Sequence, residues 1–274
     1  MILASWRTIT WLVRRADVVL EVVDARDPMG TRSRRLERIV EALGRKLIIV
    51  INKADLIPRE VAEKWKKIFE DMGYTAVYMA AREHMGTRRL RVAIKRAVET
   101  RPIIVAVTGY PKTGKSTVIN ALKGKHSAST SPIPGSPGYT THVQLYRIGR
   151  SMYMLDSPGV IPVEGDRLEA VIRGKPPEQL RDPINPAIEL LRRALRYNPR
   201  AVIDAYGIRE TDPLRILEAI AVKRGWRYKT TGEPNIEEAA RQVIRDYHEA
   251  KLNFYIPPEE FLEKRRASVE EAWL

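Results

Sequence analysis

The sequence predicts an α/β protein with a mostly parallel sheet, helices on both faces, and a mainly α-helical domain after it. Over residues 1–162, short β-branched apolar runs alternate with segments whose apolar residues recur every three or four positions. After Pro162 the strand patterns stop, and helical segments punctuated by proline follow. We therefore expect one domain over residues 1–162 and a second over residues 163–274.

The expected strands are the runs rich in valine and isoleucine, at residues 17–23, 46–51, 76–79 and 103–108. In the segments between and after these strands, apolar residues recur at helical spacing, which predicts helices at 33–43, 59–72, 87–98 and 117–122. Two paired strands are expected at 142–148 and 152–155. The second domain should hold helices at 186–197, 213–224 and 236–250 and end in a charged tail, residues 251–274, of unassigned structure.

The strand at 103–108 is followed by Gly109-Tyr110-Pro111-Lys112-Thr113-Gly114-Lys115-Ser116, which matches G-x-x-x-x-G-K-[ST]. In such a loop, glycines let backbone N–H groups curl around a β-phosphate. A helix that begins near Thr117 would point its N-terminus at the same phosphates. We assign Lys115 to the β/γ-phosphates and Ser116 to Mg²⁺.

Asn52-Lys53-Ala54-Asp55 follows the strand at 46–51 and is the expected base-reading loop. The Asp55 carboxylate can accept two hydrogen bonds from guanine N1–H and its exocyclic amine, a donor pair that adenine lacks. The stem of Lys53 can stack over the ring. The alternative is that Asp55 merely caps a helix. A weaker signal is Ala80-Ala81-Arg82, small residues after a strand that can touch guanine through a backbone amide.

Two further segments complete a nucleotide switch. Asp156-Ser157-Pro158-Gly159 follows a strand, so Asp156 can hold Mg²⁺ through water and the Gly159 amide can sense a γ-phosphate. Pro137-Gly138-Tyr139-Thr140 supplies the other switch, with Thr140 closing over Mg²⁺, Thr141 as a rival, and a plain turn as the alternative. The guanine loops thus precede the phosphate loop, which is a circular permutation of the usual GTPase order.

In this order of motifs the chain resembles the YlqF/YawG family of circularly permuted GTPases, a ribosome-assembly group that includes the nucleostemin-like proteins. The resemblance extends to residues 24–28 (Asp-Ala-Arg-Asp-Pro), 206–208 and 239–247. It implies a permuted GTPase domain that binds GTP or GDP with Mg²⁺ and partners with ribosomal RNA or a large-subunit precursor.

Two positions depart from familiar GTPases. Val160 stands where many switches carry a water-orienting glutamine, so we expect slow hydrolysis without an activating partner. Some relatives use an N-terminal histidine instead, but no histidine precedes His84, and we expect His84 and His142 to be incidental. The family commonly has asparagine, associated with bound K⁺, at position 112. Lys112 would place its ammonium there, which puts a K⁺ requirement in doubt; a solvent-facing lysine is the alternative. The candidate catalytic residues are Lys115, Lys112 and Thr140.

The charge balance of 48 Lys and Arg against 34 Asp and Glu gives +14, which favours a polyanionic partner. Thermophilic surface ion networks are the alternative for any single cluster. Absence of cysteine excludes disulfides, and no apolar run approaches the roughly 20 residues of a membrane span. We expect a cytoplasmic monomer with no membrane partner.

The sequence thus predicts a GTP-dependent switch of large-subunit assembly. The second switch runs almost directly into the helical domain, so nucleotide state is expected to shift that domain. Two alternatives stay open: a constitutive RNA-binding scaffold with a near-inactive GTPase core, and a P-loop nucleotide-metabolising enzyme.

Overall fold

The fold is described from a computed structural model, which describes residues 5–123, 129–130, 145–155, 160–164 and 167–271. The chain divides into two units, Met1–Glu164 and Gly165–Leu274. We call the first the sheet unit and the second the helical unit. Within the described ranges, every helix is too short or too polar to span a lipid bilayer.

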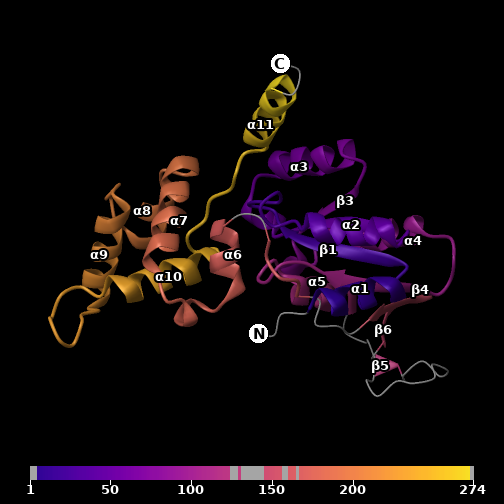
Figure 1. Cartoon of the computed structure of the whole chain (residues 1–274), viewed down its shortest axis with the longest axis horizontal. Helices are drawn as coiled ribbons and strands as arrows, with labels where there is room; N and C mark the ends of the chain where they lie inside the picture. Colours follow the sequence, from indigo (N-terminus) through magenta and orange to yellow (C-terminus); the bar gives the residue numbers. More distant parts are fainter. Residues whose placement is uncertain (1–4, 124–128, 131–144, 156–159, 165–166, 272–274) are drawn as a thin grey trace. The chain divides into compact units, whose positions relative to one another are not determined.

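The sheet unit contains a seven-stranded sheet in the order β3-β2-β1-β4-β7-β6-β5 (Figure 1). Strands β3, β2, β1, β4 and β7 are parallel to one another. Strands β6 and β5 continue the sheet beyond β7 with antiparallel pairing. The strands are β1 Val18–Asp24, β2 Lys46–Asn52, β3 Thr75–Met79, β4 Ile103–Thr108, β5 Ser129–Thr130, β6 Leu145–Gly149 and β7 Met152–Leu155. All seven residues of β1 are buried, as expected for a central parallel strand covered on both faces.

Helices cover both faces of the sheet because successive strand residues point to opposite sides. Helices α1 and α2 pack on the face that includes Val19, and α4 and α5 pack on the face that includes Leu20. Ser5 and Ser33 cap α1 and α2 through their side-chain oxygens. The helical segments of this unit are α1 Trp6–Arg15, α2 Arg34–Ala42, η1 Ala54–Leu56, α3 Arg59–Asp71, η2 Ala81–Glu83, α4 Thr87–Ala97 and α5 Lys115–Lys123.

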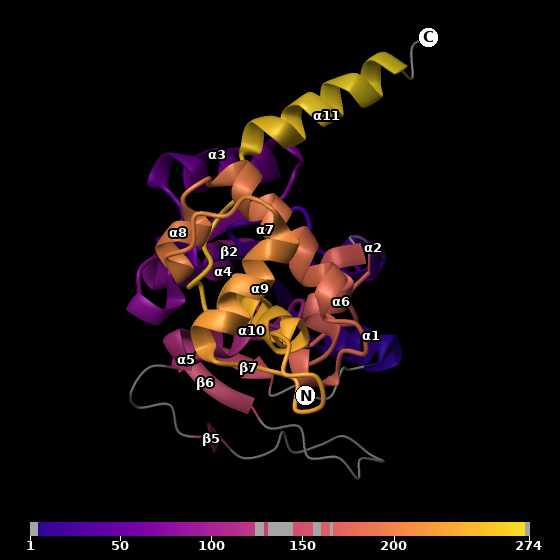
Figure 2. The same ribbon diagram turned by 90° about the vertical axis from the view of Figure 1, so that its left-hand side faces the viewer.

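The helical unit has its own apolar core, in which α10 packs against both α7 and α9 (Figure 2). Helix α9 begins at Pro213 behind an Asp212 cap and ends at Gly225 in the left-handed conformation, which glycine adopts without strain. The helical segments are α6 Arg167–Gly174, η3 Pro177–Gln179, α7 Ile184–Tyr197, α8 Ala201–Tyr206, α9 Pro213–Arg224, α10 Ile236–His248 and α11 Pro258–Glu271.

The predicted fold class, a mostly parallel α/β sheet followed by a helical region, is confirmed. Two elements differ from expectation. Helix α1 was not predicted, although Ile9, Leu12 and Val13 are buried and Trp6 and Trp11 pack against the same core. The tail contains helix α11, where Tyr197 donates a hydrogen bond of 2.6 Å to Glu260. Residues 142–144 of the predicted strand lie outside the described residues, and β6 begins at Leu145.

Candidate nucleotide-binding site

The predicted base-reading and phosphate loops meet at the carboxyl edge of the sheet. Parallel pairing aligns Asp24 of β1 with Asn52 of β2, and Asn52 with Met79 of β3. The phosphate loop leaves β4, which pairs with β1 on its other side. Open α/β sheets bind ligands at this edge. Loops separated by more than fifty residues are therefore neighbours in space.

The phosphate loop has a backbone that only glycine fits at two positions. Gly109 has φ 141°, and a Cβ there would lie 2.5 Å from the carbonyl oxygen of Val22. Gly114 has φ 94°, and a Cβ there would lie 2.1 Å from Asn52 Nδ2. These close approaches let the loop curl tightly enough to direct its amides inward.

Lys115 is buried, and its Nζ donates to the carbonyl oxygen of Tyr110 at 2.6 Å, so the ammonium lies across the loop. The Thr113 hydroxyl donates to the same carbonyl at 3.0 Å. Ser116 is exposed in the first turn of α5, where helix dipole and amides favour an anion. The remaining predicted loop residues are the buried Gly109 and Pro111 and the half-buried Lys112, Gly114 and Thr117.

Lys112 has a left-handed backbone, with φ 62°. Asparagine is one of the few residues other than glycine that is enriched in this conformation. The asparagine that the resemblance places at position 112 therefore has a backbone reason as well as a link to K⁺.

Asn52 holds the two sets of loops together. Its Nδ2 donates to the Thr113 carbonyl at 3.0 Å, and its Oδ1 accepts from the Ala81 N–H at 3.2 Å. The Asn52 side chain is 2% exposed. Both ends of its amide thus bond protein, so Asn52 joins the phosphate loop to the second guanine loop, a role that sequence reasoning missed.

Lys53 is held by a buried carboxylate that was also missed. Its Nζ lies 2.7 Å from Asp24 Oδ2, and Asp24 accepts from Arg26 Nε and Nη2 at 3.1 and 3.0 Å. Asp24 and Arg26 are both buried. These residues belong to an Asp-Ala-Arg tripeptide that begins with the last residue of β1, and its position at the end of a buried strand was the available signal. The network fixes the stem of Lys53, which is predicted to stack on the base.

Asp55 is exposed and lies within η1. It is not a helix cap, because Lys53 occupies the N-cap position of η1 and Pro58 that of α3. The capping alternative is therefore wrong, and the carboxylate is accessible for a base. Ala80 and Ala81 are buried and Arg82 is exposed. Because the Ala81 amide bonds Asn52, a guanine contact at this loop depends on its other residues.

The predicted switch residues Thr140, Thr141, Asp156 and Gly159 lie outside the described residues. Beyond the second switch, Val160 pairs with Gly109 in a parallel bridge, and the Ile161 N–H donates to the Gly109 carbonyl at 3.3 Å. The chain that leaves the switch thus pairs with the first residue of the phosphate loop, just beyond the carboxyl end of β4.

Tyr110, inside the phosphate loop, bonds Glu164, the last residue of the sheet unit. Its hydroxyl donates to the Glu164 carbonyl at 2.7 Å and accepts from the Glu164 N–H at 3.1 Å. Burial raises the pKa of Tyr110, which keeps the hydroxyl protonated and able to donate. The Glu164 carboxylate is held at 3.0 Å by Trp6 and at 2.9 Å by Arg35. The point where the chain leaves the sheet unit is therefore attached to the phosphate loop.

Glu21 is a fully buried carboxyl on β1 whose Oε1 accepts from the Ser33 N–H at 2.5 Å. Burial, together with the smaller effect of the nearby Glu37 charge, raises the pKa of Glu21 to about 8. The group is thus protonated at neutral pH. It supports the start of α2 and was not assigned a role from sequence.

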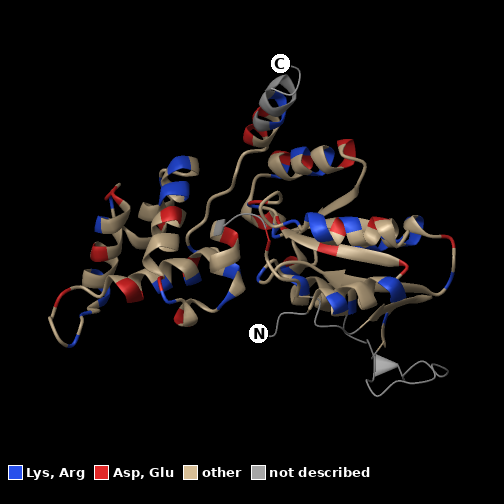
Figure 3. Ribbon diagram, in the orientation of Figure 1, with Lys and Arg blue, Asp and Glu red and all other residues tan. Residues whose placement is uncertain are grey.

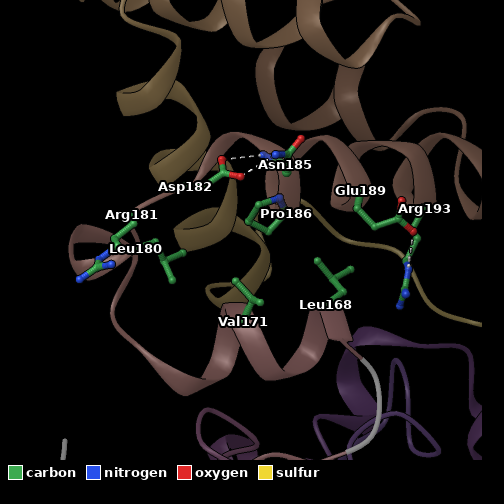
Figure 4. Close-up of a pocket in the computed structure, with 9 residues that line it drawn as sticks. All are labelled: Leu168, Val171, Leu180, Arg181, Asp182, Asn185, Pro186, Glu189 and Arg193. Carbon is green, nitrogen blue, oxygen red and sulfur yellow. Dashed lines mark hydrogen bonds and ion pairs between the residues drawn. The ribbon is translucent and has the colours of Figure 1, made fainter.

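A separate hollow of about 750 Å³ lies within the helical unit (Figure 4). Leu168, Val171 and Leu180 give it an apolar wall, and the Arg181 side chain points away from the other polar residues that line it. Arg193 pairs with Glu189, and Asp182 accepts from Asn185. None of its residues belongs to the predicted site.

Residues 7–165 match the family described as RsgA GTPase, more than half of the chain. The chain belongs to the RsgA GTPase family. The resemblance to YlqF is confirmed by solved structures. GNP-bound YlqF from T. maritima superposes with a TM-score of 0.67 at 26% identity, over 93% of this chain and 98% of that one. The GDP-bound form gives 0.64 at 25% identity.

Several relatives of this RsgA-family chain are named as GTP-binding or guanine nucleotide-binding proteins. An uncharacterized GTP-binding protein of Methanocaldococcus jannaschii is 36% identical over 89% of this chain and 65% of its own length. Nucleolar GTP-binding protein 2 of Neurospora crassa is 30% identical over 93% of this chain and 42% of its own. The guanine nucleotide-binding protein-like NSN1 of Arabidopsis thaliana is 29% identical over 93% and 48%. The chain thus spans 42% to 65% of the length of these relatives.

Proposed function

We propose that the protein is a GTP-binding and GTP-hydrolysing switch that acts in ribosome biogenesis, in assembly of the large subunit. The observation that carries the nucleotide part is the Asn52 cross-link, which joins the phosphate loop to both guanine loops. Only a ligand with phosphates at one end and a base at the other uses both halves of such a site. The YlqF-like fold and the nucleolar names of relatives support the ribosomal part.

Each residue has a defined role in the proposed nucleotide complex. Phosphates lie in the loop at the N-terminus of α5, where Lys115 moves from the Tyr110 carbonyl to the β/γ oxygens. Asp55 accepts from the guanine edge, and Lys53 covers the ring from its Asp24 anchor. The exposed Ser116 hydroxyl suits a hard cation such as Mg²⁺, with Thr140 and Asp156 as the other proposed holders. Bound Mg²⁺ would neutralise charge on the phosphate oxygens.

Slow intrinsic hydrolysis is part of the proposal. Val160 has no group that can orient or polarise water, so a partner must supply one. We expect turnover of the pure protein well below about 1 s⁻¹, the low end of ordinary enzymes. Single-turnover release of phosphate from GTP would measure it, and a rapid rate would contradict this part of the proposal.

Lys112 is proposed to place a built-in cation where relatives bind K⁺. If so, hydrolysis in sodium and in potassium buffers should be equal, and Lys112→Ala should lower the rate strongly. Potassium stimulation of the wild type would show instead that Lys112 leaves the ion site open.

The coupling between nucleotide and partner is tested by cosedimentation with large ribosomal subunits and their precursors at a fixed salt concentration. We expect stronger binding with a nonhydrolysable GTP analogue than with GDP. Equal binding in both states would favour a constitutive RNA-binding scaffold. Failure to bind in either state, together with turnover of another substrate, would favour a P-loop metabolic enzyme.

A further inference from the structure

The net positive charge of this protein lies almost entirely in the sheet unit. Residues 1–164 contain 28 Lys and Arg against 15 Asp and Glu, a net +13, whereas residues 165–274 contain 20 against 19, a net +1. Basic and acidic residues are interspersed along the helices of the helical unit (Figure 3). Attraction of a polyanion by long-range charge therefore favours the GTPase part of the chain rather than the helical unit.

Within the sheet unit, helix α4 has the most one-sided charge. Its sequence TRRLRVAIKRA contains five cations and no acid. The similar-length helix α3 has four cations and four acids and neutralises itself through pairs such as Lys66–Glu70 and Lys67–Asp71. Both charges are visible along α3 in Figure 3. A helix that only packs against the sheet does not need an excess of cations on its exposed side, as α4 has.

The cations of α4 divide into one structural arginine and an exposed set. Arg91 donates to the carbonyls of Leu122, at the end of α5, and Ile148, and burial lowers its pKa. It therefore serves packing. Arg88, Arg89, Lys95 and Arg96 are exposed. Arg89 lies over the Tyr78 ring, 5.2 Å from its centroid, and no ion pair involves the other three in the part of the chain that the structure describes.

Their arrangement follows from how α4 packs. Leu90 and Ile94 are fully buried against the sheet, so the opposite side of the helix faces solvent. Arg88 and Arg96 are eight residues apart, about 12 Å along the helix axis.

A shallow groove of about 530 Å³ lies beside these cations. Its apolar floor comes from Val92, which is 39% exposed, and the neighbouring Ala93 and Ala97, and it reaches Thr75 at the start of the edge strand β3. Arg88, Arg89 and Arg96 rim it. Guanidinium groups bind phosphate oxygens bidentately, while an apolar floor accommodates a sugar or base face.

We propose that the outer face of α4 with this groove, defined by Arg88, Arg89, Val92, Lys95 and Arg96, is a nucleic-acid-binding surface that contacts the RNA backbone. This inference rests on the proposed function, because it assigns to the GTPase unit a contact with the RNA that the protein is proposed to bind. The occupant is an RNA strand because both the local cations and the +13 of the whole unit attract an extended polyanion.

The location connects RNA contact to the nucleotide site. Helix α4 begins four residues after η2, the loop whose Ala81 amide bonds Asn52. Arg91 ties the same helix to the end of α5, which starts in the phosphate loop. Displacement of α4 by RNA would act on both loops through these bonds.

The test compares the triple variant R88E/K95E/R96E with R209E/R215E/K229E, a control with equal charge change at exposed positions of the helical unit. Binding of each to purified large-subunit ribosomal RNA and to large subunits is titrated over a range of NaCl, with the GTP analogue bound. Melting curves and GDP affinity, expected to match the wild type, show that the variants are folded.

We expect the α4 variant to bind RNA at least 10-fold more weakly at about 150 mM salt and to lower the slope of log K against log salt by about 2 to 3, for three lost phosphate contacts. The control variant should stay within about 3-fold of wild type. The neutral variant R88Q/K95Q/R96Q should show an intermediate loss.

Equal loss in the α4 and control variants would overturn the assignment, since net charge alone would then govern binding. Loss only in the control would place the RNA surface on the helical unit and also overturn it. Polyglutamate that competes as well as RNA at equal charge would assign the face to an acidic protein instead. If the wild type binds neither RNA nor subunits in any nucleotide state, the proposed function itself fails.

Discussion

Replacement of Asn52 by alanine tests the central cross-link of the site. The change removes the acceptor of the Ala81 N–H and the donor to the Thr113 carbonyl. Thr113 is fully buried and Ala81 is 3% exposed, so both backbone groups lose a partner in a dry environment. Each such loss costs about 1–3 kcal/mol. We expect a total of about 2–4 kcal/mol, because water can enter the space left by the side chain.

This energy should appear mainly as lost nucleotide affinity, since the bonds hold the two loops in the arrangement that a nucleotide needs. At about 1.4 kcal/mol per tenfold, the Kd for GDP should rise roughly 30- to 1,000-fold. Fluorescence titration with a labelled GDP measures the Kd, and urea unfolding without nucleotide measures the part that appears as lost stability.

Two companion variants sharpen the test. Asn120→Ala, at an exposed position of α5, removes the same side chain where it should have no effect. Asn52→Asp keeps an acceptor for Ala81 but places a carboxylate beside the Thr113 carbonyl, so its effect isolates the second bond. A Kd for Asn52→Ala within threefold of wild type, with unchanged stability, would refute the view that this side chain assembles the site.

Three further predictions concern single side chains. Asp55→Asn should lower the affinity for GTP by about 100-fold or more and favour binding of xanthosine triphosphate, because xanthine has a carbonyl where guanine has its amine. Equal loss of affinity for both nucleotides in binding titrations would contradict this base contact. Glu21→Gln should remove a pH dependence: the raised pKa of about 8 means that wild-type stability falls as pH rises from about 4.5 to 8, by at most about 5 kcal/mol. Urea unfolding at pH 5 and pH 8.5 should therefore show the variant gaining on wild type at the higher pH, and parallel curves would show that Glu21 titrates normally. Tyr110→Phe should cost about 1–3 kcal/mol and speed hydrogen exchange of the Glu164 amide, to which the hydroxyl is bonded. Unchanged exchange at Glu164 would mean that Trp6 and Arg35 suffice to hold that residue.

The sequence by itself determined the fold class and the position of the predicted nucleotide loops. Their signals are local: the glycines at 109 and 114, Lys115 and Asp55 lie within single short motifs next to apolar runs. Motif order alone indicated the permutation. Local signals also have limits: α1 was not predicted although its apolar residues recur at helical spacing, and α11 lies in a segment rich in charge.

Only the tertiary structure decided what connects these motifs. The bonds of Asn52 to Thr113, of Lys53 to Asp24 and of Tyr110 to Glu164 join residues 61, 29 and 54 positions apart. Such contacts depend on strand order and register, which are set by the packing of the whole sheet and leave no mark in the spacing of residues. The charged residues can be counted from the sequence, but they can be assigned to one unit or the other only once the fold shows where the first unit ends.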